Sequence, residues 1–165
     1  MTDTADLVDG FVRMRGALVR EADAVPPALR TTPFVGHWNL MDLLAHLVGW
    51  DYTNVNAIEE LKAGTIPAFY AHYDPGWVSY NQQLIDRYGA EAWDELRGSL
   101  RQSQEAVVGM LRLLTPEELT RALSDAGRWR RPVSIAGIVR AAIRDEREHL
   151  QQIRAFVGSR GMGSG

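Results

Sequence analysis

Apolar residues recur at spacings of three and four along four long stretches of the chain, and proline, glycine and helix-capping residues mark the breaks between them. This spacing is typical of amphipathic helices, because 3.6 residues per turn place such positions on one face. The pattern predicts helices over residues 4–24, 39–63, 90–114 and 134–158. No stretch shows the strict alternation of a strand. The sequence therefore predicts an all-α protein built as a four-helix bundle.

Local signals mark the ends of these helices. The prolines at 26–27 end the first helix, since proline lacks the amide hydrogen that a helix interior requires. Asn39 is a good N-cap for the second helix, with Asp42 in its first turn, and Ser134 suits the N-cap of the last. Residues 115–118, with the sequence TPEE, have the pattern of a capping box with proline at the first helical position. We expect a short helix there.

The segment between the second and third long helices is rich in aromatic residues. We expect residues 67–89 to form a loop followed by a short helix over residues 77–88, lying across one end of the bundle. Such a segment either walls a pocket for an apolar ligand or covers the core, and the second use is the commoner one. The aromatic residues are Phe69, Tyr70, Tyr73, Trp77, Tyr80 and Tyr88.

The length of 165 residues and the hydrophobic content of 45% suit one globular domain with its own core. We expect this domain to span residues 1–158 and the glycine-rich tail 159–165 to be flexible. Trp93, Trp129 and the aromatic segment add apolar area that a bundle of this size need not cover alone. We therefore also expect a homodimer, the commonest symmetric assembly.

Composition and charge exclude several classes of function. A net charge of −3 argues against a nucleic-acid partner, and the basic run at residues 128–131 is expected to be a solvated loop. The chain has no cysteine, so disulfides and thiolate chemistry are excluded. Its start lacks a basic and apolar leader, and no segment is apolar enough to span a membrane, which predicts a soluble cytoplasmic protein. Neither a phosphate-binding glycine loop nor a serine-nucleophile elbow occurs, which argues against nucleotide cofactors and serine catalysis.

Two distant histidines are the main candidates for chemistry. Asp145 and His149 are one helical turn apart and point the same way, so both can bind one divalent ion. His46, at the margin of the second helix's apolar face, is the natural third ligand. A set of imidazole and carboxylate ligands suits Zn, Ni, Fe or Mn and leaves positions open for water or substrate. The alternative is structural: a hydrogen-bonded Asp–His pair and a histidine satisfied in the core.

Other polar residues face the bundle interior as well. Glu146 is a candidate proton shuttle, because burial would raise the pKa of its carboxyl; the alternative is a buried acid bonded to a Trp, a Tyr or an Arg. Trp50, Asp51 and Asn54 are candidate substrate contacts, although hydrogen bonding to the aromatic segment is the favoured use of the two polar ones. The remaining histidines, at 37 and 72, fall in predicted loops and are expected to have surface or capping roles.

Two segments carry a resemblance to a known family. Residues 38–47, WNLMDLLAHL, and residues 145–153, DEREHLQQI, resemble the second-helix and fourth-helix motifs of the DinB-like superfamily of four-helix bundles. The likeness in helix order extends to about residue 157. It implies a divalent metal held by three histidines, one on helix two and two spaced i and i+4 on helix four. Carried over, His46 and His149 match ligands, whereas this chain has Asp145 at the third position.

The resemblance suggests two kinds of activity. Some DinB-like relatives are thiol-dependent transferases and isomerases that use bacillithiol or mycothiol, so our leading hypothesis is a metal-dependent enzyme. In it His46, Asp145 and His149 hold the ion, and water or a low-molecular-weight thiol attacks a small electrophilic substrate, with Glu146 as orienting group or proton shuttle. The aromatic segment is also similar to the neighbouring ClbS/DfsB branch, which protects against reactive metabolites without the metal triad. One alternative is a metal-free resistance protein that binds or hydrolyses such a metabolite, and another is a non-catalytic bundle that binds a small molecule. A third is a non-catalytic bundle whose polar interior residues only fix packing, and this one predicts no pocket beside His46 and His149.

Overall fold

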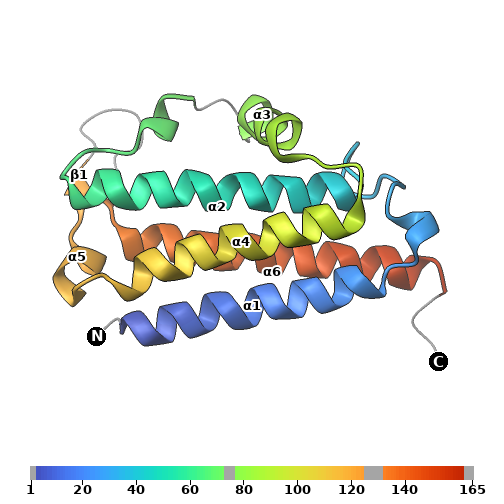
Figure 1. Cartoon of the computed structure of the whole chain (residues 1–165), viewed down its shortest axis with the longest axis horizontal. Helices are drawn as coiled ribbons and strands as arrows, with labels where there is room; N and C mark the ends of the chain where they lie inside the picture. The colour runs from blue at the N-terminus through green and yellow to red at the C-terminus, as the bar shows by residue number, and fades with distance from the viewer. Residues whose placement is uncertain (1–2, 73–76, 125–131, 162–165) are drawn as a thin grey trace.

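The computed structural model describes residues 3–72, 77–124 and 132–161 and consists of four long helices with shorter elements between them (Figure 1). The predicted all-α four-helix bundle is confirmed. Among the described residues, no helix is long and apolar enough to cross a membrane. The long helices are α1 (Thr4–Ala24), α2 (Leu40–Lys62), α4 (Trp93–Arg112) and α6 (Ile135–Ser159).

The shorter elements include one that the sequence pattern did not predict. Two antiparallel strands of two residues each precede α6. Strands of this length are too short to show an alternation of apolar and polar residues. The basic run 128–131, Tyr73, Trp129 and residues 162–165 of the tail lie outside the described residues. The elements are η1 (Pro27–Leu29), η2 (Ala68–His72), α3 (Val78–Tyr88), α5 (Pro116–Thr120), β1 (Leu123–Ser124) and β2 (Pro132–Val133).

Most predicted helix ends are confirmed by their caps. Asn39 and Asp42 form a reciprocal capping box at the start of α2, and the Ser134 side chain accepts a hydrogen bond from Gly137 N at the start of α6. The third long helix begins three residues later than predicted, at Trp93, where acidic residues occupy its first turn. Acidic side chains favour the positive end of a helix, and this signal outweighs the apolar periodicity that favoured residue 90. Helix α6 passes Gly158 by one residue, so the tail begins later as well.

The course of the chain explains where the aromatic segment lies. Asp23 near the end of α1 pairs with Arg97 near the start of α4, so these two helices are antiparallel, whereas α2 and α4 run in the same direction (Figure 1). A tight turn cannot join parallel neighbours, so the chain must return along the bundle between them. Segments η2 and α3 make this return along the outer side of α2. The prediction that the segment lies across one end of the bundle is therefore wrong.

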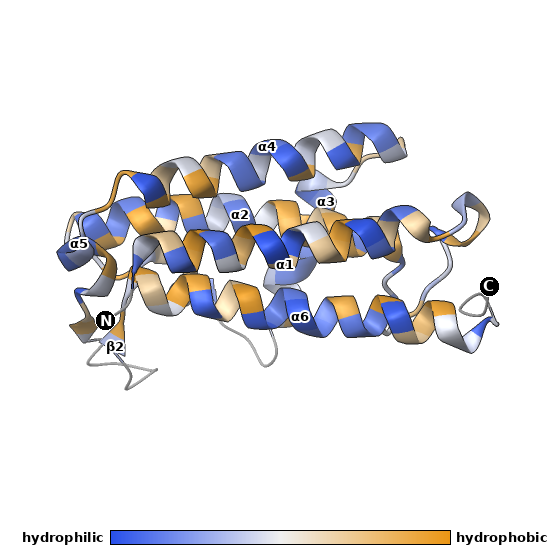
Figure 2. Cartoon of the chain, turned by 90° about the horizontal axis from the view of Figure 1, so that it is seen from below, coloured by the Kyte–Doolittle hydropathy of each residue, from blue (hydrophilic) through white to orange (hydrophobic). Residues whose placement is uncertain are grey.

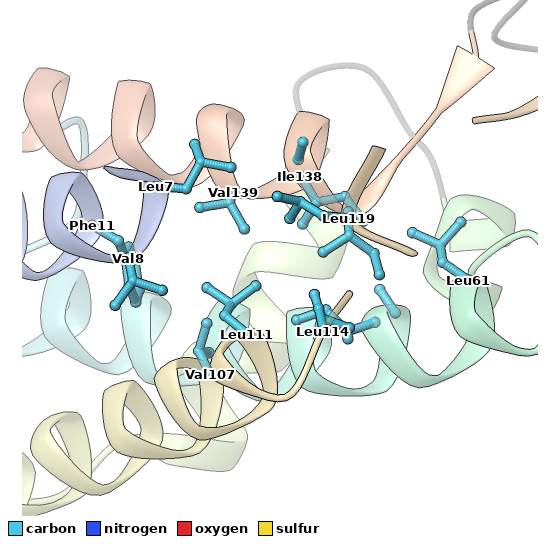
Figure 3. Close-up of a cluster of buried hydrophobic side chains, with 14 of the residues drawn as sticks. Leu7, Val8, Phe11, Leu61, Val107, Leu111, Leu114, Leu119, Ile138 and Val139 are labelled. Atoms are coloured by element: carbon cyan, nitrogen blue, oxygen red, sulfur yellow. The ribbon is translucent and has the colours of Figure 1, made fainter. Parts of the chain in front are cut away.

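A polar layer divides the interior of the bundle into two apolar clusters. Hydrophobic and hydrophilic residues alternate around each long helix (Figure 2), and the cluster on the α5 side of the layer is shown in Figure 3. The second cluster lies toward the start of α2. Each long helix contributes to both clusters and gives one side chain to a network of hydrogen-bonded polar residues between them. These four buried residues are Arg15, Asp51, Ser103 and Glu146.

Helices α2 and α3 approach closely at Gly49, where an added Cβ would lie 2.5 Å from the Cβ of Leu84. Real Cβ atoms do not approach so closely, so Gly49→Ala should force α3 away from α2. Overpacking of this kind costs about 1–3 kcal/mol. We expect that loss in the free energy of unfolding, measured by chemical denaturation.

Gly109 provides the matched control, because it also lies within a helix but an added Cβ would meet nothing within 4 Å. Gly109→Ala should stabilise the protein by up to about 1 kcal/mol through its helix propensity. Equal stability of Gly49→Ala and the unmodified protein would show that α3 is not held at this distance by packing.

Candidate metal centre

Three side chains from two antiparallel helices converge at one point. His46 comes from α2, and Asp145 and His149 come from successive turns of α6. One potential ligand atom from each residue lies within 4.8 Å of the other two. The Oδ2 atom of Asp145 lies 3.4 Å from His46 Nε2 and 3.3 Å from His149 Nε2. The structure thus brings together the three residues that the sequence singled out, and they form a cluster able to hold a metal ion.

The geometry of the cluster fits an ion. Two ligands bound at about 2.1 Å to a tetrahedral ion are roughly 3.4 Å apart, which matches both nitrogen-to-oxygen distances. Within the described part of the chain, His46 Nδ1 and His149 Nε2 are buried without a hydrogen-bond partner. Although His149 Nε2 is 3.3 Å from Asp145, the contact lacks hydrogen-bond geometry. A buried nitrogen without a partner costs free energy, and ligation of an ion by His149 Nε2 would remove that cost. The orphaned Nδ1 of His46 is not the atom that faces the cluster, because Nε2 of that ring lies next to Asp145.

Gln152 fixes the orientation of one histidine. The Nδ1 atom of His149 lies 2.8 Å from Gln152 Oε1, an acceptor, so Nδ1 carries the proton. The other ring nitrogen, Nε2, then has its lone pair free and lies 3.3 Å from Asp145 Oδ2. This is how a partner outside the metal shell selects the tautomer of a metal-binding histidine.

The environment sets the charges of the three groups. Burial lowers the pKa of His46, against the opposing effect of its hydrogen bond to Asp145. Burial acts on His149 in the same direction, but its contact with Asp145 outweighs burial and raises the pKa of His149. For Asp145, burial raises the pKa, whereas the contacts with His149 and His46 prevail and lower it. At neutral pH the site therefore offers an ionised carboxylate and a neutral His46, the forms that bind metals, whereas the raised pKa of His149 means that a proton competes with an ion for this ring.

A cavity of about 750 Å³ opens beside the cluster. His46 and Asp145 lie in its wall, which continues along α2 and α6 and is closed on one side by the aromatic segment. The volume is in the range of small-molecule sites. A bundle whose polar interior residues only fix packing was expected to have no such pocket, so the cavity argues against that alternative. The aromatic residues of the wall are Trp50, Phe69, Tyr70 and Trp77.

Glu146 and Asp51 are held by a buried arginine. Arg15 donates to both oxygens of Asp51 at 3.0 and 2.9 Å and to both oxygens of Glu146 at 3.0 and 2.6 Å. Ser103 Oγ adds a 2.6 Å bond to Asp51. Burial raises the pKa of Glu146, although Arg15 opposes this. The expected alternative for Glu146, a buried acid bonded to an Arg, is what the structure shows.

The candidate substrate contacts all reach the cavity, but their partners differ from expectation. Trp50 Nε1, rather than Asp51, donates a hydrogen bond to the aromatic segment, at 2.8 Å to Asn81 in α3. Asp51 instead belongs to the network of Arg15. Asn54 is buried and lines the cavity. The pattern of apolar positions could not predict this hydrogen bond, because it treats Trp50 as an apolar residue and ignores the N–H group of its ring.

Two functional residues escaped prediction. Arg15 lies four residues after Phe11 and three before Leu18, so the helical spacing does mark it as an inward position. Gln152, three residues after His149, is at the spacing of a same-face partner, which was the available signal. The histidines at 37 and 72 are exposed, as expected.

The fold and the cluster define a helical bundle with a His–Asp–His site at a cavity wall. A family model for the DinB superfamily matches residues 11–153. The chain belongs to the DinB superfamily, which confirms the resemblance read from its two motifs. A search of curated proteins finds no match.

Solved structures support the same fold. A protein from Streptococcus pneumoniae is similar with a TM-score of 0.78 and 16% identity, covering 94% of this chain and 91% of that one. Uncharacterised proteins from Clostridium difficile 630 and Escherichia coli UTI89 give TM-scores of 0.76 and 0.77 at 15% identity. These cover 94% and 98% of this chain, and 96% of each of the others. At such identities the likeness establishes the fold alone.

Proposed function

We propose that the protein is a divalent-metal-dependent enzyme that acts on a small electrophilic molecule by hydrolysis or by transfer of a low-molecular-weight thiol. The observation that carries the proposal is the convergence of His46, Asp145 and His149 at the wall of a cavity large enough for a substrate. Two histidines and one carboxylate suit Zn, Ni, Fe or Mn and leave ligand positions facing the cavity. When bound, the ion supplies Lewis acidity and lowers the pKa of a coordinated water or thiol.

Individual residues of the chain have separate roles in this proposal. Asp145 and the two histidines would hold the ion, and Gln152 keeps the Nε2 atom of His149 available for it. Glu146 acts as a positioning residue rather than a proton shuttle, since both its oxygens are bonded to Arg15. Glu146 is the neighbour of Asp145 within α6. The bonds from Arg15 to Glu146 therefore also hold the helix turn that carries the carboxylate ligand. The aromatic wall around Trp50 would hold the apolar part of a substrate and exclude water.

Removal of metal tests this function. We expect an untagged preparation to catalyse either conjugation of monobromobimane with cysteine or hydrolysis of 4-nitrophenyl acetate. Dialysis against a chelator should lower that turnover at least tenfold, and added Zn²⁺, Ni²⁺, Fe²⁺ or Mn²⁺ should restore it. Turnover that survives chelation would contradict metal dependence.

A second candidate function is favoured by the residue at position 145. Asp145 replaces the histidine that the resemblance implies, and its side chain is 47% exposed. This supports a metal-free protein of the ClbS/DfsB type, which binds or hydrolyses a reactive metabolite in the cavity. Under this alternative, chelation leaves binding and turnover unchanged. The same experiment therefore decides between the two functions.

A further inference from the structure

One amide in the cavity wall has an orientation that its partner determines. Trp50 Nε1 donates a hydrogen bond to the Oδ1 atom of Asn81 at 2.8 Å. An indole N–H group can only donate, so the oxygen of the amide must face Trp50 and its NH2 group must point elsewhere. The amide therefore presents two N–H donors to whatever lies on its other side.

These donors have no acceptor among the residues that the structure describes. The NH2 group of Asn81 makes no hydrogen bond with any of them. Its nitrogen is not one of the buried atoms that lack a partner, so it reaches open space, and Asn81 lines the cavity. The N–H groups are thus available to an acceptor that is bound in the cavity.

The amide lies beside the metal centre. Burial lowers the pKa of His46, and contacts with Asp145 and Asn81 oppose this effect. The ring of Trp50, whose N–H group orients the amide, is 6.4 Å from the His46 ring between centroids. His46 and Asn81 also share the wall of the cavity. A ligand atom that accepts a hydrogen bond from Asn81 is therefore close to the His–Asp–His cluster.

Helix α3 holds this amide in a fixed place. Thr53 donates its hydroxyl hydrogen to Gly49 O at 3.0 Å, so its oxygen accepts from the Tyr80 hydroxyl at 2.9 Å. One turn further along α3, Leu84 approaches Gly49 closely. Helices α2 and α3 are thus joined on both sides of Asn81, and a donor held in this way binds an acceptor at a low cost in conformational entropy.

The surroundings of the amide favour a neutral acceptor on an apolar ligand. The rings of Phe69 and Trp77 line the same cavity, and their centroids are 5.5 and 5.7 Å from that of Trp50. Transfer of an anion to apolar surroundings is costly without a cation, whereas a carbonyl oxygen needs only a hydrogen bond. A carbonyl group attached to an apolar or aromatic body matches both the donors and the rings.

We propose that Asn81 determines specificity by donating a hydrogen bond from its NH2 group to a carbonyl oxygen of the ligand. The apolar part of the ligand lies against Trp50, Phe69 and Trp77. The substrate class is a carbonyl compound with an apolar or aromatic body, such as an aryl ketone or an aryl ester. The assignment of this carbonyl as the electrophilic group rests on the proposed function, but the acceptor subsite itself does not.

Two probes of nearly equal shape test the subsite. Acetophenone carries a carbonyl oxygen that ethylbenzene lacks, and both are titrated into isotope-labelled, chelated protein, so that no ion can bind the carbonyl. Acetophenone should bind roughly three- to tenfold more tightly, the usual net effect of one hydrogen bond. It should also move the side-chain NH2 protons of Asn81 further downfield in the NMR spectrum than ethylbenzene does. Equal affinities, or no binding of acetophenone at millimolar concentration, would overturn the proposal.

A variant of the amide locates the subsite. Asn81→Asp keeps an oxygen for Trp50 but removes both donors, so it should abolish the preference for acetophenone and leave the affinity for ethylbenzene nearly unchanged. Its spectrum also identifies the NH2 signal of Asn81 by the loss of that signal. Gln83→Glu, the same amide-to-acid change at an exposed residue of α3 outside the lining, should preserve the preference. A preference that survives Asn81→Asp would overturn the assignment.

A second variant tests the orientation of the amide. Trp50→Phe removes the N–H group that fixes Asn81 and retains an aromatic ring. The amide is then free to turn, so the preference for acetophenone should fall, though less than in Asn81→Asp. Because Trp50→Phe leaves Asn81 in place, it tests the subsite even if Asn81→Asp does not fold stably. An undiminished preference in Trp50→Phe would contradict the proposed orientation.

The two proposals can fail independently. Preference for acetophenone on chelated protein, with turnover that ignores metal, would support the acceptor subsite and contradict the metal-dependent enzyme. Metal-dependent turnover without this preference would support the enzyme and overturn the subsite.

Discussion

Arg15→Met is expected to lower the free energy of unfolding by about 3–5 kcal/mol, because it leaves Asp51 and Glu146 buried without their cation. A loss of this size should lower the Tm by roughly 10 °C in a domain of this length. Burial removes water that would otherwise stabilise the carboxylates, so the cost greatly exceeds that of a surface pair. Chemical denaturation and calorimetry measure it.

Two further measurements identify the cause. Burial already raises the pKa of Glu146 against the effect of Arg15, and loss of Arg15 removes that opposition. In the variant the Glu146 carboxyl therefore binds its proton more readily when folded than when unfolded, and stability is lost as pH rises from the unfolded to the folded pKa. The deficit should therefore be smaller at pH 5 than at pH 8. Replacing all three charged residues by apolar ones, as Arg15→Met with Asp51→Leu and Glu146→Leu, should recover most of the stability.

The control is an ion pair of the same chemistry at the surface. Arg97 donates to both oxygens of Asp23 at 2.8 and 3.2 Å, with side chains 24% and 46% exposed. Arg97→Met should cost less than about 1 kcal/mol, because solvent and salt weaken exposed pairs. If the changes at Arg15 and Arg97 cost the same, the polar layer does not hold the bundle together through buried charge.

The helices were predictable because their signals are local. Periodicity, the Asn39 and Ser134 caps and the proline breaks act within one or two turns, and the structure confirms them. The polar layer was harder to predict, because its partners are far apart in sequence: Arg15 is 131 residues from Glu146. Spacing can show that an arginine faces inward but not which acid meets it.

The candidate site shows the same division. The turn between Asp145 and His149 is a local property of one helix, so their common direction was evident from spacing alone. Their meeting with His46 depends on how α2 and α6 are aligned, which spacing within one helix cannot show. The position of His46 at the margin of an apolar face made it a candidate, and the resemblance to DinB-like motifs supported it. The cavity was not predictable, because it depends on the return of η2 and α3 along α2, which follows from the order of the helices in space.

Loss of one metal ligand should have a larger effect than any other change in the site. We expect His149→Ala and His46→Ala to weaken Zn²⁺ binding by more than about 100-fold, because removal of a partner outside the metal shell alone costs roughly 10–100-fold. Gln152→Ala, which frees the His149 ring without removing a ligand, should fall within that smaller range. Competition with a chromophoric chelator, on protein without a polyhistidine tag, measures each affinity.

Position 145 and an exposed histidine complete the series. Asp145→Ala should weaken Zn²⁺ binding as strongly as the histidine variants, because the carboxylate lies between the two imidazoles at 3.4 and 3.3 Å. Asp145→His should bind at least as tightly as the unmodified protein, since it restores the three-histidine set and the half-exposed position leaves room for the ring. His72→Ala, which alters an exposed histidine outside the cluster, should leave the affinity unchanged. Zinc affinities equal to that of the unmodified protein in all six variants would place zinc elsewhere on the protein and remove the metal centre from the proposed function.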